Sequence, residues 1–145
     1  MSTRKMSKTD FETLAQFRYA LRRFLRFSEE VTRKSGVTPL QYQLMLQIKG
    51  FPGRDWANVD ELAERLQAKH HGVVALISRC EEAGLVRRNA SRGDKRRVEV
   101  KLTKKGEECL EQLARLHRDE LQSVKGGFSV VSMNDDAQQT PPARA

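Results

Sequence analysis

The stretch NVDELAERLQAKHHGVVALISRCEEAG, residues 58–84, holds two short helical patterns separated by a few polar residues. Asn58 with Glu61 three residues later is a helix-start signal, and an apolar face of about two turns follows it. A second helix is expected over residues 70–83, because Gly84 suits the position just past a helix end. Two short helices joined by a tight turn predict a helix-turn-helix.

The second of these helices has two distinct sides when its residues are spaced at 100° per step. Its apolar side is predicted to contain Val73, Leu76, Ile77 and Cys80, and the opposite side His71, Ala75, Ser78 and Glu82, flanked by Val74 and Arg79. An α-helix fits the major groove of DNA, where hydroxyl, imidazole and small apolar groups can contact base edges. The candidate base contacts are His71, Val74, Ala75 and Ser78, and the alternative is the outer face of an ordinary amphipathic helix.

The turn between the two helices, Gln67–Lys69, ends on a lysine. Lys69 stands where Ser or Thr would supply a capping oxygen, so it adds a cation but no cap. Because helix starts leave backbone N–H groups unpaired, an incoming phosphate could satisfy these donors.

A cationic β-hairpin is predicted directly after the helix-turn-helix. Leu85 and Val86 begin one strand, Asn89–Arg97 form the loop, and Val98–Leu102 alternate apolar and polar residues as the return strand. Residues 87–105 contain nine Lys or Arg against two acids. Such a run is often only a solvated face, but beside a candidate recognition helix it predicts contact with a polyanion, and an arginine on a narrow loop can enter a minor groove. Asp94 is expected to pair with a neighbouring arginine and hold the loop in shape.

Three further helices are expected around this central segment. Apolar residues recur at helical spacing over residues 10–34, and Thr38, Pro39 and Gln41 form a second start signal, followed by a buried face of Leu40, Leu44, Met45 and Ile48. Thr103 caps a last long helix, whose apolar stripe comprises Cys109, Leu110, Leu113, Leu116, Leu121 and Val124.

Composition narrows the classes of function. The 145-residue chain has a formal net charge of +8, which favours nucleic acid or an anionic surface as partner. No apolar run approaches the ~18 residues of a membrane span, so a cytoplasmic location without membrane contact is expected. No nucleophile, base and acid converge in a catalytic pattern, and the adjacent His70 and His71 point in different directions, so no enzyme activity, metal site or cofactor is expected.

The segment VDELAERLQAKHHGVVALISRCEEAGLVRRNASRGDKRRVEVKLTKKG, with TPLQYQLMLQI before it, resembles the MarR family of winged helix-turn-helix regulators. The resemblance covers about Leu14 to Leu121. It implies a mainly α fold with a small β-hairpin, built as a winged helix-turn-helix with long N- and C-terminal dimerisation helices. The expected organisation is a flexible segment 1–9, a single domain 10–127 and a disordered tail 128–145. Within the domain, residues 10–34 and 104–125 would form the dimerisation helices and 38–102 the DNA-binding lobe.

The resemblance also implies a function. Members of this kind are homodimeric transcription regulators, usually repressors, that bind a pseudo-palindromic operator in double-stranded DNA and are often released by a small aromatic ligand. The wing arginine corresponding to Arg96 would enter the minor groove, supported by Asp94, with Arg92, Lys95 and Arg97 as expected phosphate partners. Because this chain has Lys69, Gly72 and Ala75 where many relatives carry Ser, Thr or Arg, base contacts would depend more on His70, His71 and Ser78.

The same resemblance predicts two further sites. The dimer interface would be formed by Phe11, Leu14, Phe17, Leu21, Leu113, Leu116 and Leu121. The ligand cleft would be lined by Phe24, Phe27, Tyr42 and Trp56, although each of these could equally be a core residue.

Two alternative functions stay open. A winged helix can act as a protein-interaction module, in which case the cationic hairpin would meet an acidic protein surface. The two cysteines, Cys80 and Cys109, are expected to be buried structural thiols, but a thiol-based oxidant-sensing regulator is the other alternative.

Overall fold

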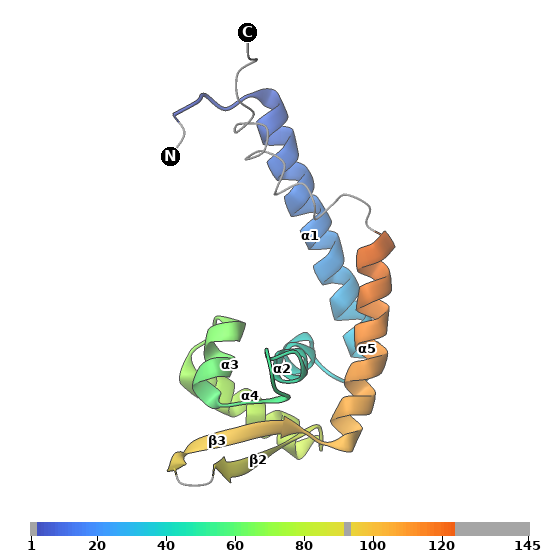
Figure 1. The fold of residues 1–145 in the computed structure, drawn as a ribbon. Coiled ribbons are helices and arrows are strands. Elements are labelled where there is room, and N and C mark those ends of the chain that lie inside the picture. Colours follow the sequence, from blue (N-terminus) through green and yellow to red (C-terminus); the bar gives the residue numbers. More distant parts are fainter. Residues whose placement is uncertain (1–2, 92–93, 124–145) are drawn as a thin grey trace. The chain divides into compact units, whose positions relative to one another are not determined.

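A computed structural model describes residues 3–91 and 94–123, and within β3 the side chains from residue 98 onward. The element order is α1 (Lys8–Lys34), α2 (Pro39–Lys49), β1 (Trp56–Ala57), α3 (Val59–Leu66), α4 (His70–Glu82), β2 (Val86–Ser91), β3 (Asp94–Leu102) and α5 (Lys104–Ser123) (Figure 1). The chain divides into two compact units, one of Met1–Ser28 with Arg118–Ala145 and the other of Glu29–His117. The predicted tail, residues 128–145, lies outside the described residues.

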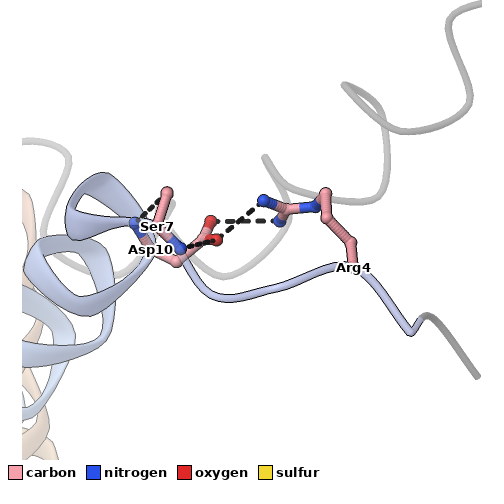
Figure 2. A network of polar contacts seen from close by, with 3 residues as sticks. All are labelled: Arg4, Ser7 and Asp10. Carbon is pink, nitrogen blue, oxygen red and sulfur yellow. Dashed lines mark hydrogen bonds and ion pairs between the residues drawn. The ribbon is translucent and has the colours of Figure 1, made fainter.

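In the first unit, α1 begins two residues earlier than the apolar spacing predicts. The Asp10 N–H donates to Ser7 Oγ at 3.1 Å, and the Ser7 N–H donates to Asp10 Oδ2 at 3.0 Å, which forms a capping box (Figure 2). Arg4 forms an ion pair with the same carboxylate at 2.9 Å. Hydrogen bonds from Arg4 and from the Ser7 backbone lower the pKa of Asp10 from its ordinary 3.8 to about 2.

In the second unit, both predicted start signals are confirmed as reciprocal capping boxes. Thr38 and Gln41 cap α2, and Asn58 and Glu61 cap α3. The predicted buried face of α2 is wrong at one position: Leu40 is 53% exposed, and the buried residues are instead Tyr42, Leu44, Met45 and Ile48. Leu40 lies in the first helical turn, where the apolar neighbours of the core do not reach.

The sheet has three antiparallel strands in the order β1-β3-β2, and so extends the predicted hairpin. The two-residue strand β1 was not foreseen; Ala57 pairs with Val100, and both side chains are fully buried. The hairpin loop is shorter than the predicted span of 89–97, because Asn89 pairs with Glu99 and Ala90 with Val98. Backbone pairing therefore continues past the point where the apolar alternation stops.

The core of the second unit lies between the helices and the sheet. The predicted inner face of α4 is confirmed, because Val73, Leu76, Ile77 and Cys80 are all buried in it. Gly106 allows α5 to begin against the start of β2, since a Cβ at this position would lie 2.0 Å from the Leu85 carbonyl oxygen. This packing fixes the helix-turn-helix and the hairpin as parts of one compact unit.

Candidate nucleic-acid interface

The turn between α3 and α4 is defined by backbone geometry. Gln67 ends α3 in the left-handed region with φ 50°, and its Nε2 donates to the Glu64 carbonyl at 2.8 Å. Lys69 then precedes α4 with an extended backbone and no side-chain cap. The first N–H groups of a helix have no partner within it, and Lys69 supplies no side-chain acceptor for those of α4.

The predicted base contacts of α4 are divided between exposed and half-buried positions. His71 and Ala75 are exposed, as are Lys69 and His70, whereas Val74 and Ser78 are half-buried. A Cβ at Gly72 would meet no atom within 4 Å, so this part of the helix surface is not crowded. The N-terminal half of α4 therefore presents a small-residue surface with two imidazoles.

One imidazole already has a partner. His70 Nδ1 lies 2.9 Å from Asp60 Oδ1, which connects the first turn of α4 to the first turn of α3. Both side chains are exposed. Only Nε2 of His70 is left for a further hydrogen bond, while among the described residues no such contact restricts His71.

Arg88 is a functional candidate that the sequence analysis counted only as part of a cationic run. Its Nη2 donates to Ser78 Oγ and lies 3.4 Å from the Val74 carbonyl oxygen, and its backbone N–H donates to Glu81 Oε2 at 3.2 Å. Arg88 therefore connects β2 to α4 rather than pointing its charge into solvent. Only the three-dimensional register of β2 against α4 reveals this role, because Arg88 is ten positions after Ser78 in the sequence.

Two other basic residues of the run also have partners inside the unit. Lys101 Nζ lies 3.8 Å from Asp55, and Lys105 Nζ donates to the Ala83 carbonyl at 2.9 Å, at the C-terminal end of α4. A cation at this end of a helix is favourable. Arg87 and Lys104 are exposed. The charge available to a polyanion is thus smaller than the sequence count suggests.

The predicted wing contacts fall on residues or side chains outside the described part of the chain. Arg92 lies outside the described residues, and Asp94, Lys95, Arg96 and Arg97 belong to β3 with side chains outside the description. The role of Arg96 in a minor groove and that of Asp94 in loop shape stay predictions.

A pocket of about 520 Å³ opens between the start of α3, α4 and the hairpin. Val74, Ile77 and Val98 contribute apolar surface to it, and Asp60, His70 and Arg88 contribute polar groups. Its polar groups carry both signs of charge, and Asp60 and Arg88 already bind neighbours in the same unit.

The predicted dimer residues differ in exposure. Phe11 and Leu14 are 57% and 53% exposed, and Leu116 and Leu121 are also exposed, whereas Phe17 and Leu21 are half-buried. Leu113 requires correction as an interface residue, because its side chain is fully buried in the core of the second unit. Phe11 and Leu14 are thus large apolar side chains exposed on α1.

The predicted cleft residues are divided between the two units. Phe24 and Phe27 belong to the first and are half-buried, and Tyr42 and Trp56 belong to the second. Tyr42 is buried and stacks on His117 with ring centroids 4.2 Å apart, and burial raises the pKa of its phenol. The Arg54 guanidinium lies 3.9 Å from the Trp56 ring centroid. Neither unit by itself holds all four side chains.

Among the described residues, no group of three or more His, Cys, Asp or Glu side chains is arranged to hold a metal ion. In the same part of the chain, no helix combines the length and apolarity needed to span a bilayer.

Comparison with known proteins finds similarity to transcriptional regulators. The model of the MarR family matches residues 35–97. The chain is 30% identical over 84 residues to the HTH-type transcriptional repressor MdtR of Bacillus subtilis, covering 58% of this chain, and 29% identical over 90 residues to a putative transcriptional regulatory protein for the hcr operon of Thauera aromatica, covering 62%. In both cases the chain spans about half of the relative, 52% of its length.

Solved structures share the fold. AbsC, a MarR family transcriptional regulator from Streptomyces coelicolor, aligns with a TM-score of 0.71 and 22% identity, over 94% of this chain and 89% of its own. A second MarR family regulator from the same organism, solved in complex with DNA, aligns with a TM-score of 0.70 and 21% identity, over 98% and 94%. Residues 35–97 thus match the model of the MarR family, and the chain has the winged helix-turn-helix fold of these solved structures.

Proposed function

We propose that the protein is a transcription regulator that binds double-stranded DNA sequence-specifically through α4. The observation that carries this proposal is the N-terminal half of α4, which is exposed, free of bulky side chains at Gly72 and Ala75, and uncapped at Lys69. A neighbouring fold has been solved in complex with DNA, which supports the same use of this surface.

Two kinds of contact would combine at this surface. Unpaired N–H groups at a helix start and the Lys69 ammonium favour a phosphate, which positions the helix but carries no sequence information. The imidazole of His71 and the small side chain of Ala75 are suited to base edges and thymine methyls in the major groove. The hairpin follows the same helix and carries the wing residues 92–97, for which we propose contacts in the flanking minor groove.

The regulator is proposed to act as a homodimer and a repressor. Exposed Phe11 and Leu14 on α1, with Leu116 and Leu121 on α5, supply the apolar surface that a partner would cover. Two recognition helices would then contact half-sites about one helical turn, ~34–36 Å, apart. The repressor role is supported by the name of the relative MdtR, which is a transcriptional repressor. Release of the DNA by a small aromatic ligand is part of the same proposal.

Selection of bound sequences from a random duplex pool tests the proposal. We expect an inverted repeat whose duplex binds at least about 10³-fold more tightly than a scrambled duplex, with affinity that falls steeply with salt. Ala75→Glu should abolish this preference, because it places a carboxylate on the exposed face of α4. The matched control is Gln112→Glu, which adds the same charge at an exposed position of α5 and should retain the preference.

A protein-interaction module would give a different result, since the wild-type protein would bind selected and scrambled duplexes equally. That outcome would contradict sequence-specific binding and favour an acidic protein as the partner.

The oxidant-sensing alternative gains no support from Cys80. Burial raises the pKa of the Cys80 thiol to about 11, and the thiol is fully buried in the core. Burial also raises the pKa of the half-buried Cys109. Because the thiolate is the form that reacts with peroxide, both environments suppress oxidation at neutral pH.

A further inference from the structure

The junction between α4 and the hairpin is built around a single arginine. Arg88 of β2 reaches Val74, Ser78 and Glu81, which are spaced by four and three residues and so lie on one stripe of α4. Its Nε lies 3.8 Å from Glu81 Oε1 and, among the described atoms, has no hydrogen-bond partner. The guanidinium is partly withdrawn from solvent, where such contacts are stronger than at an open surface.

The hydrogen bond from Arg88 to Ser78 argues against Ser78 as a direct base contact. A serine hydroxyl has one proton and two lone pairs, and the Arg88 guanidinium occupies one of those lone pairs. Ser78 is also half-buried, unlike His71 and Ala75 on the same helix. Its side chain therefore faces the hairpin junction, which is a poor position for a direct base contact.

Because Arg88 lies in β2, a small change of angle at its contact with α4 would displace the end of the strand that leads into the wing. Ser91 at the end of β2 is three positions after Arg88, which corresponds to about 10 Å of strand. A tilt of about 10° at the junction would move the strand end by about 1.7 Å over this length. Displacements of this size disrupt hydrogen bonds that a binding site must hold in place.

We propose that Arg88 and Ser78 are positioning residues that set the angle between the wing and the recognition helix. Ser78 serves sequence recognition through Arg88 and makes no base contact itself. The proposal rests on the proposed function, since it assumes that α4 and the hairpin contact one duplex together.

A double-mutant cycle tests this proposal, with affinities measured for the selected operator and for a scrambled duplex. Ser78→Ala and Arg88→Met should each lower operator affinity about tenfold, and the double variant should also lose about tenfold rather than about a hundredfold, because both changes break the same contact. Ser78→Thr keeps the hydroxyl and should retain operator affinity within about twofold. Thermal melting of each variant verifies that it is folded at the assay temperature.

Arg87→Met is the matched control, because it removes the same charge from the neighbouring, exposed position of β2. It should weaken both duplexes equally, by about the effect of one phosphate contact, and leave the ratio of operator to scrambled affinity unchanged. Arg88→Met should lower that ratio.

Three outcomes would overturn the proposal. Additive losses in the double variant would make Ser78 and Arg88 independent contacts, and a changed preference at one base pair in Ser78→Ala alone would make Ser78 a base contact. If Arg88→Met and Arg87→Met changed the two affinities equally, Arg88 would contribute only its charge and would have no positioning role. In each of these cases the wild type still prefers the operator, whereas a wild type without preference would contradict the proposed function itself and this proposal with it.

Discussion

The starts of the five described helices differ in one respect. Four of them are capped by a side chain, through Ser7 in α1, Thr38 in α2, Asn58 in α3 and Thr103 in α5. The start of α4 has Lys69 and no capping oxygen. A cap contributes about 0.5–2 kcal/mol to stability, so α4 lacks a contribution that the other helices have.

The difference is most informative between α3 and α4, which are consecutive. In α3, Glu61 accepts from the Asn58 N–H and also forms an ion pair with Arg54, so this carboxylate is engaged by neighbours within the unit. In α4, the corresponding donors and a lysine stay available to a ligand. The chain therefore caps the start of α3 with its own side chains, whereas for the start of α4 we propose an external phosphate as the partner.

The largest effect is expected from Lys69→Glu, which replaces the cation at the uncapped start with an anion. Affinity for any duplex should fall by about tenfold or more, because phosphate contacts do not depend on sequence. Lys104→Glu is the control, since it makes the same charge change at the capped start of α5 and should have a smaller effect. Fluorescence anisotropy with scrambled DNA measures both, and equal losses would remove the distinction between the two starts.

Asn58→Ala should have the next largest effect, on stability rather than on DNA binding. Removal of the cap leaves a donor of α3 unpaired and should lower the free energy of unfolding by about 1 kcal/mol, and at most about 2. Urea denaturation provides the measurement. An unchanged midpoint would show that the capping box of α3 does not stabilise the fold.

Lys69→Ser should give α4 a side-chain cap like that of α3. The new hydroxyl can cap the helix and should raise the free energy of unfolding by about 0.5–1 kcal/mol, while the lost cation weakens binding to every duplex. Denaturation and anisotropy on the same variant separate the two effects. If stability and affinity rose together, the uncapped start would have no role in DNA binding.

The smallest effect concerns the capped start of α1. Because the folded-state pKa of Asp10 is lowered to about 2, its stabilising contribution is present above its ordinary value of 3.8 and is lost as the pH falls towards 2. Amide chemical shifts in the first turn of α1 should change over this range in the wild type. In Asp10→Asn they should not, and identical titrations would contradict the role of this carboxylate.

Local signals in the sequence predicted the helices well. The two capping boxes need only residues three apart, and the inner face of α4 follows from helical spacing, so both were available without tertiary information. The same spacing placed Leu40 in the core, and the resemblance placed Leu113 of the last apolar stripe at an interface. Both placements failed because spacing identifies an apolar stripe but not what covers it.

The parts that could not be predicted depend on contacts between distant residues. β1 consists of two residues whose only signal is their pairing with Lys101 and Val100. In the sequence, Arg88 and Lys105 are both simply cations of one basic run. In the structure, Arg88 donates a hydrogen bond to Ser78 and Lys105 donates one to the Ala83 carbonyl. Net charge therefore indicated the class of partner but not which cations are available to it.

The central claim, that duplex DNA meets the uncapped start of α4, can be tested by following backbone amide signals by NMR during titration with the selected operator. We expect the largest shifts at His70, His71 and Gly72, and smaller shifts of the same amides with scrambled DNA. Shifts confined to other helices, with these three amides unchanged, would contradict it.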